Sequence, residues 1–307
     1  MSDLNNPIFT DSDKAREFLE AQRWPHGATC PHCGAIEATE LQGKAHRAGV
    51  YQCNACREQF TVTVGTVFER SKIDLSKWLL ATFLLSASKK GMSAHQIHRM
   101  LGVTYKTAWF MCHRIREAMK QGGGLLGGPT TPVEVDETYW GNNGKRPKGS
   151  RGGSHKMKIV SLVERGGDKR SFHVPNVTAK TLRPILTKHI SAKAKLMTDE
   201  AAVYPGLSVD FAGHGVVNHS LKEYKRGDAT TNTVESSFSL LKRGLIGTFH
   251  HVSEQHLQRY ADEFDFRWNH RKTTDMQRAE AAMRGIGGKR LTYRQPADST
   301  NAGLIGV

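Results

Sequence analysis

The stretch VEVDETYW, residues 133–140, alternates apolar and polar side chains in the pattern of a β-strand. Alternation puts Val133 and Val135 on one face of this strand and Glu134 and Asp136 on the other. A carboxylate flanked by β-branched residues is costly to bury unless it is exposed or bound to a cation. The stretch therefore predicts a strand whose acids are either exposed or bound to a cation.

The sequence around this stretch predicts a mixed α/β domain. Strand-like segments alternate with segments of helical spacing. The expected elements are the strands KIVSLVE (158–164), SFHVPNV (171–177) and AKLMTDEA (194–201), the helix TLRPILTKHI (181–190), and helical spacing from about Thr231 to Arg271 with a break around Gly247–His251.

Two further acids follow in this region. Asp199 comes after the apolar segment AKLMT, and Glu235 lies in TNTVESSFSLLKRG (231–244). Three acids on two strands and a helix can hold two divalent metal ions, and oxygen ligands suit Mg²⁺ or Mn²⁺. Taken singly, each acid is also explained as a surface or capping carboxylate. On a helix, the polar stripe contains Asn232, Glu235, Ser239 and Lys242, and the apolar stripe contains Val234, Phe238, Leu241 and Leu245.

Four of the cysteines form the pattern C-x2-C-x19-C-x2-C at Cys30, Cys33, Cys53 and Cys56. The two thiolates of each pair can reach one ion, and two pairs complete the tetrahedron that Zn²⁺ prefers. Because all four positions are filled by protein, the pattern predicts a structural zinc ribbon; four free thiols are the alternative. The remaining cysteine, Cys112, stands on an apolar helix and is expected in the core.

Residues 93–119 predict two helices joined by a tight turn at Gly102. In a helix-turn-helix, the second helix, which carries Lys106, would lie in the major groove of DNA. Basic residues along both helices favour this interpretation over an ordinary helical hairpin. Such contacts would mostly hold phosphates.

The chain has 307 residues, with 44 Lys and Arg against 29 Asp and Glu, a formal net charge of +15. This surplus favours a polyanionic partner, most commonly nucleic acid, over a basic solubilising surface. The polar N-terminal segment does not resemble a signal peptide, and the longest apolar stretch, Trp78–Ala87, is too short to span a membrane. The cysteine pairs also differ from a secreted disulfide framework, so we expect a cytoplasmic protein with no membrane partner.

These patterns predict five segments along the chain. The glycine-rich stretch QGGGLLGGP (121–129) favours a linker between two folded parts. The expected segments are an N-terminal helix and zinc ribbon (1–70), a helix-turn-helix-like module (71–120), a Gly-rich linker (121–130), an α/β catalytic domain (131–280) and a loose C-terminal tail (281–307).

The three acids also match a known arrangement. Asp136, Asp199 and Glu235 resemble the acidic triad of the DDE transposases, whose best-known interval is the thirty-five residues that here separate the last two acids. Lys242 follows Glu235 by seven positions, where these enzymes usually carry a basic residue. More widely, the chain is similar, over roughly residues 10–275, to the insertion-sequence transposases with an N-terminal zinc ribbon, the ISXO-like group. The matching strings are RWPHGATCPHCG, YQCNACREQFTVTVGTVFE, VEVDETYWG, NTVESSFSLLKRGLIGTFHHVS and HLQRYADEFDFRWNHR.

This resemblance implies a ribonuclease-H-like α/β fold for the catalytic domain. It implies that Asp136 lies on the central strand, Asp199 on a neighbouring strand and Glu235 on a flanking helix. It further implies that Lys242 contacts a phosphate near the scissile bond and that Asn232 orients substrate or a ligand. A solvated lysine and a helix-capping asparagine remain the alternatives for these two residues.

The segment GNNGKRPKGSRGGSHK (141–156) has five basic residues and no acidic one. Its glycines allow the backbone to approach phosphate, and its cations would displace counterions from DNA. DNA contact is favoured because the segment directly follows the proposed catalytic strand; a hairpin with no role is the alternative. The expected DNA-binding residues are Lys106, Lys145, Arg146, Lys148, Arg151, Asn232, Lys242 and Arg243.

The leading hypothesis is a DNA transposase that binds the inverted repeats at the ends of its own element. It would use Mg²⁺ or Mn²⁺ for phosphodiester hydrolysis and for strand transfer to target DNA. Because both ends must be held together, we expect a homodimer or a higher oligomer in the active complex. One alternative is a zinc-ribbon DNA-binding regulator with a non-catalytic ribonuclease-H-like domain, against which the full acidic set argues. The other is a metal-dependent DNA nuclease, which the acids alone do not separate from a transposase.

Overall fold

The structure is a computed structural model that describes residues 3–141, 155–201, 203–204, 206 and 208–292. The chain forms two compact units. Among the described residues, one unit contains residues 3–121 and 273–292, and the other lies within residues 122–272.

The N-terminal part of the first unit is built on one helix and a small antiparallel sheet. Helix α1 (Ser12–Arg23) begins after Asp11, whose side chain accepts the backbone N–H of Asp13 and of Lys14. The rings of Trp24, Tyr51 and Phe60 pack against one another and join the end of this helix to the sheet. The strands are β1 (Ala38–Glu40), β2 (Tyr51–Cys53) and β3 (Gln59–Phe60), in the order β1-β2-β3.

Further helices complete the first unit. Helix α3 ends at Gly102, whose φ of 61° lies in the left-handed region, and α4 begins after Thr104, whose hydroxyl accepts the N–H of Thr107. The tight turn predicted at Gly102 therefore lies between two capped helices, and Cys112 of α4 is buried as expected. The helices are α2 (Leu75–Ala87), α3 (Ala94–Leu101), α4 (Tyr105–Met119) and α8 (Asp275–Arg284).

Helix α8 belongs to the first unit rather than to the α/β unit. It packs mainly on α2 and also contacts α1 and α4, and its Met283 and the following Ile286 are buried. The backbone N–H of Val67 donates to the carbonyl of Ile286 at 3.2 Å. The structure thus differs from the predicted domain end at residue 280 and from the loose tail predicted from residue 281, because apolar side chains anchor this segment. Residues 293–307 lie outside the described residues.

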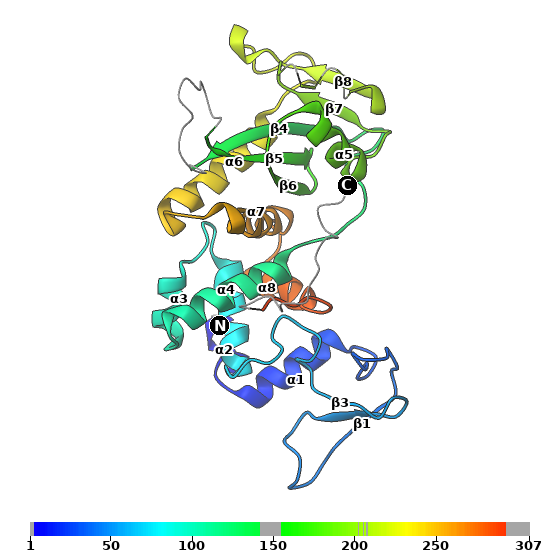
Figure 1. The fold of residues 1–307 in the computed structure, drawn as a ribbon, viewed down its shortest axis with the longest axis vertical. Helices are drawn as coiled ribbons and strands as arrows, with labels where there is room; N and C mark the ends of the chain where they lie inside the picture. Colours follow the sequence, from blue (N-terminus) through cyan, green and yellow to red (C-terminus); the bar gives the residue numbers. More distant parts are fainter. Residues whose placement is uncertain (1–2, 142–154, 202, 205, 207, 293–307) are drawn as a thin grey trace. The chain divides into compact units, whose positions relative to one another are not determined.

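The second unit is a five-stranded sheet with helices on both faces (Figure 1). The strands are β4 (Val133–Trp140), β5 (Met157–Glu164), β6 (Lys169–Val174), β7 (Lys195–Thr198) and β8 (Gly213–Val216), in the order β6-β5-β4-β7-β8. β6, β5 and β4 pair antiparallel, whereas β7 pairs parallel with both β4 and β8. The predicted functional strand β4 is therefore the central strand of the sheet.

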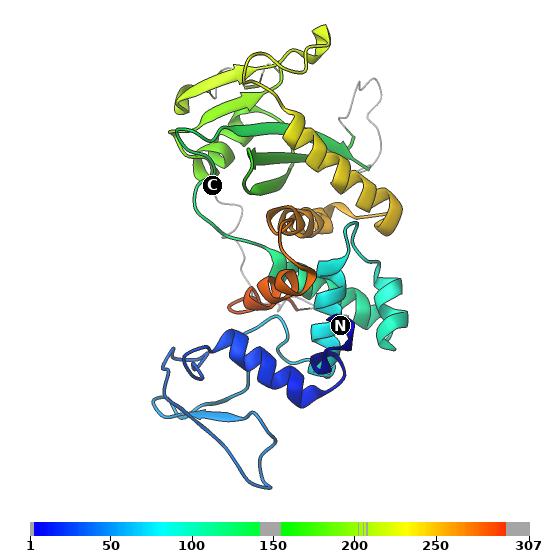
Figure 2. The ribbon, with the colours of Figure 1, turned by 180° about the vertical axis from the view of Figure 1, so that it is seen from behind.

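The two faces of this sheet are covered by different helices (Figures 1 and 2). Val133 and Val135 of β4 pack in one apolar cluster with Leu186 of α5 (Ala179–His189). On the other face, Ile159 of β5 packs with Leu241 of α6 (Asn232–Gly244) and with residues of α7 (Glu254–Asn269). A π-helical turn, Leu245–Phe249, follows α6 at the predicted break. The alternation predicted for β4 is confirmed, so Glu134 and Asp136 face α6.

The glycine-rich segment 121–130 is part of the α/β unit rather than a free connection. Leu126 is buried, its N–H donates to the carbonyl of His189, and its carbonyl accepts the N–H of Ser191. The N–H of Gly127 donates to Oε2 of Glu164 at 3.1 Å. The predicted linker therefore ends before Leu126, because the Leu126 side chain is buried in the core of the α/β unit and its backbone is hydrogen-bonded there.

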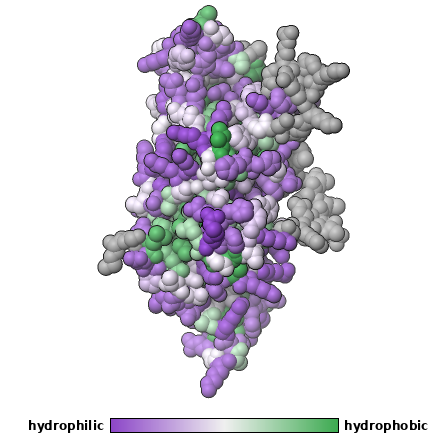
Figure 3. All heavy atoms as spheres, turned by 90° about the vertical axis from the view of Figure 1, so that its left-hand side faces the viewer, coloured by the Kyte–Doolittle hydropathy of each residue, from purple (hydrophilic) through white to green (hydrophobic). Residues whose placement is uncertain are grey.

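The surface agrees with the strongly charged composition. On the face shown in Figure 3, hydrophilic residues predominate and hydrophobic residues form small patches between them. Among the described residues, no helix combines the length and the hydrophobicity that a membrane span needs. The apolar helix α2, for example, has 13 residues.

Gly285 provides a test of how α8 packs against α4. A Cβ at this position would collide with the backbone carbonyl oxygen of Ala118, at the end of α4. We expect Gly285→Ala to lower the free energy of unfolding by about 1–3 kcal/mol, the usual cost of overpacking. Gly287→Ala is the matched control, because nothing lies within 4 Å of its Cβ position. Thermal unfolding followed by circular dichroism compares the two variants, and equal midpoints would contradict this packing.

Candidate functional site

The four predicted cysteines come together in the first unit. The Sγ atoms of Cys30 and Cys56 are 3.7 Å apart, those of Cys33 and Cys53 are 3.6 Å apart, and all four lie within 4.8 Å of one another. A tetrahedral ion with Zn–S distances of about 2.3 Å needs sulfur atoms separated by about 3.8 Å. The cluster therefore fits a four-coordinate zinc ion that has no open position for substrate.

Backbone N–H groups support the thiolate form of this cluster. The N–H of His32 points at Sγ of Cys30 at 3.4 Å, and the N–H of Cys56 points at Sγ of Cys53 at 3.5 Å. The latter hydrogen bond is the largest of several that lower the pKa of the Cys53 thiol to about 6, whereas burial and the neighbouring thiols raise the pKa of the Cys56 thiol to about 12. Since the thiolate is the metal-binding form, the local backbone favours metal binding.

Asp136 and Asp199 come from neighbouring parallel strands at the same level of the sheet. The register pairs Glu134 of β4 with Met197 of β7, and each aspartate lies two residues further along the chain. Asp136 lies within β4, whereas Asp199 directly follows the end of β7. Both are half-buried. The parallel pairing thus brings together two acids that are far apart in the sequence.

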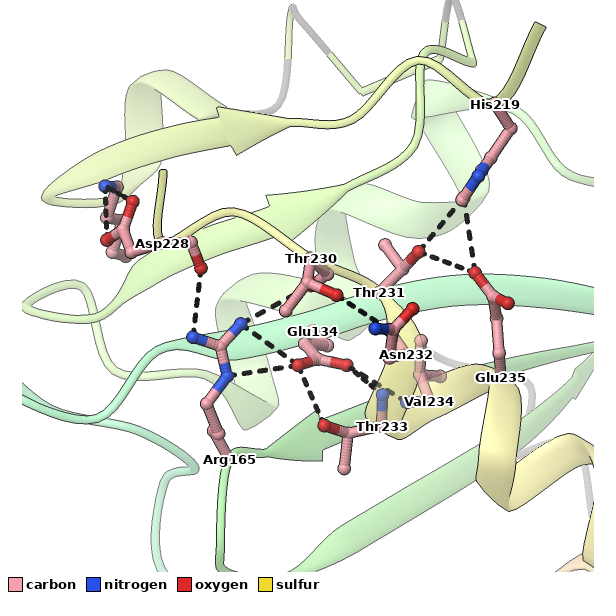
Figure 4. A network of polar contacts seen from close by, with 11 residues as sticks. Glu134, Arg165, His219, Asp228, Thr230, Thr231, Asn232, Thr233, Val234 and Glu235 are labelled. Carbon is pink, nitrogen blue, oxygen red and sulfur yellow. Dashed lines mark hydrogen bonds and ion pairs between the residues drawn. The ribbon is translucent and has the colours of Figure 1, made fainter. Parts of the chain in front are cut away.

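Glu235 comes from the first turn of α6, on the face of the sheet that carries Asp136. Its Oε1 accepts the hydroxyl of Thr231 at 2.8 Å and lies 3.2 Å from Nε2 of His219 (Figure 4). The side chain of Glu235 is 43% exposed to solvent. One carboxylate oxygen is therefore held by the protein while the group remains open to a ligand.

The other two acids act electrostatically on Asp136. Burial raises the pKa of Asp136 to about 7, and the negative charges of Glu137, Asp199 and Glu235 add to this rise. A divalent cation would reverse the effect by favouring the ionised carboxylate. In the described part of the chain, only the cysteine cluster has its potential ligand atoms within 4.8 Å. The potential ligand atoms of Asp136, Asp199 and Glu235 therefore do not meet within that distance in this structure.

Glu134, on the same face of β4 as Asp136, is fully buried and contacts the start of α6 (Figure 4). Its carboxylate accepts hydrogen bonds from Arg165, Thr233 and Val234. The strand pattern places Glu134 beside Asp136 but predicts no partner for it, because the donors come from residues 31 or more positions away.

Two further residues lie near the acids, and no pattern in the sequence predicts that they do. Tyr204 donates its hydroxyl to Oε2 of Glu137 at 2.6 Å, and burial raises the pKa of Glu137. His219 contacts Glu235 from a short 3₁₀ turn. Both Tyr204 and His219 lie in irregular segments, where neither periodicity nor spacing relates them to an acid.

The remaining predicted residues are spread over α6 and α4. Lys242 and Arg243 stand in the last turn of α6, where Lys242 is half-buried and Arg243 exposed. Asn232 is the exposed first residue of α6, so it does not cap the helix; Thr231 occupies the cap position. Lys106 is exposed in the first turn of α4. Outside the described residues lie Lys145, Arg146, Lys148 and Arg151.

Lys106 lines a basic cleft in the first unit. This cleft has a volume of about 340 Å³, and no acidic side chain of the described residues lines it. The guanidinium of Arg114 lies over the ring of Phe110, 4.9 Å from its centre. Such a cleft suits an anionic ligand. Its main lining residues are Arg70, Lys72, Trp78, Lys106, Phe110 and Arg114.

Each of the two parts of the chain matches a known protein family. Residues 125–269 match the ISXO2-like transposase domain, and residues 10–59 match the transposase zinc-ribbon domain. The chain is also 30% identical, over 275 residues, to a Halobacterium salinarum protein described as an uncharacterized protein in transposable element ISH50. That similarity covers 84% of this chain and 91% of the relative.

The chain belongs to the ISXO2-like transposases. It is thus a DNA transposase of an insertion sequence, with an N-terminal zinc-ribbon segment and a mixed α/β transposase domain. The leading hypothesis from the sequence is confirmed at this level.

The cysteine cluster of this transposase can be tested by its metal content. We expect one zinc ion per chain in the wild type and its loss in Cys53→Ser, because three thiolates hold the ion far less tightly than four. Cys112→Ala, which removes a thiol outside the cluster, should keep the zinc. Elemental analysis by mass spectrometry decides, and a full complement of zinc in Cys53→Ser would contradict the assignment.

The raised pKa of Asp136 predicts a pH dependence of stability. Between pH 3.8, the ordinary pKa of an aspartate, and about 7, the folded state binds a proton that the unfolded state has lost. The free energy of unfolding therefore falls as pH rises through this range, by at most about 1.4 kcal/mol per pH unit. Without divalent metal, Asp136→Asn should flatten this slope and raise the unfolding temperature at pH 7.5.

The matched control is Asp168→Asn, which changes an exposed aspartate of the same unit. Calorimetry at several pH values measures both variants. An Asp136→Asn variant with the slope of the wild type would show that Asp136 does not titrate in this range.

Proposed function

We propose that this transposase cleaves and joins DNA with a DDE active site formed by Asp136, Asp199 and Glu235. The supporting observation is that Asp136 on β4 and Asp199, directly after the neighbouring parallel strand β7, stand at the same level, while the charges of Asp199 and Glu235 act on Asp136. Carboxylate ligands of this kind suit Mg²⁺ or Mn²⁺. Bound there, two such ions would activate a water molecule or a 3′-hydroxyl for in-line attack on phosphorus and stabilise the leaving oxygen.

The chain's own residues would hold and orient the reacting groups. Asp136 and Asp199 act from the strands, and Glu235 acts from α6. Lys242 lies two helical turns beyond Glu235 on the same side of α6, so its ammonium can contact a phosphate near the scissile bond. Asn232, exposed at the start of α6, orients substrate DNA or a ligand.

The sheet supports a ribonuclease-H-like assignment for the catalytic domain, here taken as residues 122–272. Antiparallel strands β6, β5 and β4 are followed by parallel strands β7 and β8, with helices on both faces. The resemblance to DDE enzymes implies acids on the central strand, on its neighbour and on a flanking helix. In this chain those elements are β4, β7 and α6.

The first unit would bind the inverted repeats at the ends of the element. The capped pair α3–α4 has the order and the turn of a helix-turn-helix, and its Lys106 lines the basic cleft. The zinc ribbon, stabilised by Zn²⁺, would add contacts, as would the basic segment 141–156 and Arg243. A surplus of 15 positive charges favours these contacts through release of counterions.

The active complex would contain two or more copies of the chain, because both ends of the element must be held while strands are transferred. A purely regulatory protein is a weaker candidate. A carboxylate whose pKa is raised by burial, and further by other acids, costs stability, and a metal site gives a reason for that cost. A nuclease that cuts without joining differs only in its products.

The proposed reaction can be tested with DNA that carries the inverted repeats of the element. With Mg²⁺ or Mn²⁺, we expect the wild type to cut at the repeat ends and to join the freed 3′-ends to target DNA. Asp199→Asn should reduce both steps by at least about 10³-fold, because one metal ligand is lost, while binding of the ends is kept. Asp168→Asn is the matched control and should react as the wild type does.

Gel assays of cleavage, joining and end binding separate the alternatives. Cleavage without joining indicates a nuclease, and tight end binding with no chemistry in either metal indicates a regulator. If Asp199→Asn cuts as well as the wild type, the assignment of the acids is wrong.

A further inference from the structure

Helix α6, which carries Glu235, receives no capping hydrogen bond from its own cap residue. Thr231 occupies the cap position, but its side chain makes no capping hydrogen bond and instead donates to Glu235. The first turn of a helix leaves backbone N–H groups without intrahelical partners. At α6 two of these groups need an acceptor from elsewhere in the fold.

The acceptor is Glu134, from the central strand β4 (Figure 4). Its Oε2 accepts the N–H of Thr233 at 2.8 Å and the N–H of Val234 at 3.0 Å. Its Oε1 accepts the hydroxyl of Thr233 at 2.9 Å. A carboxylate on a strand thus caps a helix that starts 98 residues later in the chain, since Glu134 and Asn232 differ by 232 − 134 = 98 positions.

Arg165 completes this contact from the end of β5. Its Nε and a terminal nitrogen lie 3.1 and 3.0 Å from Oε1 of Glu134. The same guanidinium donates to the carbonyls of Asp228 and Thr230, in the segment that leads into α6. Arg165 therefore neutralises the buried carboxylate and also holds the chain that enters the helix.

Among the described residues, each polar contact of this carboxylate comes from a donor, on both of its oxygens. A glutamine in its place would have to direct its NH₂ group either at two backbone N–H groups or at Arg165 and a hydroxyl. Either orientation brings donors face to face. The site therefore accepts an ionised glutamate and rejects its neutral isostere, although the two side chains have nearly the same shape.

We propose that Glu134 is a positioning residue for the DDE reaction: it caps α6 from β4 and thereby sets Glu235 against Asp136. This inference rests on the proposed function. Glu134 and Asp136 stand two residues apart on the same face of one strand, and Val234 directly precedes Glu235. The carboxylate of Glu134 thus joins the two elements that carry the first and the third acid.

Glu134→Gln tests this role. We expect peptides that span the start of α6 to exchange their amide hydrogens at least tenfold faster. In one orientation of the glutamine, Thr233 and Val234 lose their acceptor, and in the other its NH₂ group repels Arg165 and loosens the cap. Metal-dependent cleavage of the repeat ends should fall about 10²-fold, as expected for a misplaced ligand. The Mn²⁺ concentration for half-maximal cleavage should rise, and Mn²⁺ binding without DNA, measured by electron paramagnetic resonance, should weaken. Binding of the repeat ends should remain unchanged.

Glu263→Gln is the matched control for the loss of a buried charge. Glu263 is also fully buried in the same unit and pairs with Arg267, but this pair lies within α7. We expect Glu263→Gln to lower the unfolding temperature about as much as Glu134→Gln does. It should leave amide exchange at the start of α6, metal dependence and cleavage as in the wild type.

The two possible failures can be told apart. A wild type that does not cut the repeat ends would overturn the proposed function. If the wild type cuts and Glu134→Gln matches it in exchange, metal dependence and rate, the positioning role alone is overturned. It is also overturned if Glu263→Gln shows the same losses.

Should Glu134→Gln not fold, Thr233→Val provides the second test. Valine keeps the shape of threonine and removes one donor, while both backbone N–H groups keep the carboxylate. We expect three- to tenfold slower cleavage and a higher requirement for Mn²⁺ in a folded protein. A Thr233→Val variant with the metal dependence of the wild type would contradict the proposal.

Discussion

Parallel pairing of β4 with β7 is the constraint on which the candidate site depends. The register that pairs Glu134 with Met197 also sets the level at which Asp136 and Asp199 stand. A slip of one residue would turn one aspartate to the opposite face of the sheet. The register is held because Leu196 and its apolar neighbours on β4 pack in a single core beneath α5. Apolar packing on one face thus determines where the acids lie on the other.

The third acid depends on a different kind of contact. The apolar residues Val234, Phe238 and Leu241 fix which side of α6 faces the sheet. The hydrogen bonds that the carboxylate of Glu134 accepts from the backbone N–H groups of Thr233 and Val234 fix where α6 begins. Burying this charge costs several kcal/mol, and only a complete set of donors offsets such a cost.

The two carboxylates on one face of β4 therefore have different roles in the protein. Glu134 is fully buried and satisfied by donors, so it contributes to a rigid framework. Asp136 is half-buried, and burial, with a smaller contribution from the neighbouring acids, raises its pKa to about 7. A carboxylate left in this state destabilises the free protein, and a bound cation would relieve the repulsion. The stable framework around Glu134 offsets the free-energy cost of the repulsion between the acids around Asp136.

The amino-acid sequence by itself determined the elements and the acids they carry. Periodicity located β4 and the helices on either side of Gly102, because side chains repeat at two or 3.6 residues along the chain. It did not find β8, the edge strand GHGV, which has two glycines and no fully buried side chain. It also assigned α8 and Leu126 to the wrong segments, because local patterns do not tell which core an apolar residue joins.

What only the tertiary structure decided was which residues meet. Cysteine spacing was sufficient to predict the zinc-ribbon cluster, because ligands two residues apart meet through a local turn. Glu134, Arg165 and the start of α6 meet only after the sheet has formed and the helix has docked on it. The same holds for His219 beside Glu235. Contacts of this kind join residues that are distant in sequence, and the free energy that selects them comes from packing of the whole unit, which no local pattern records.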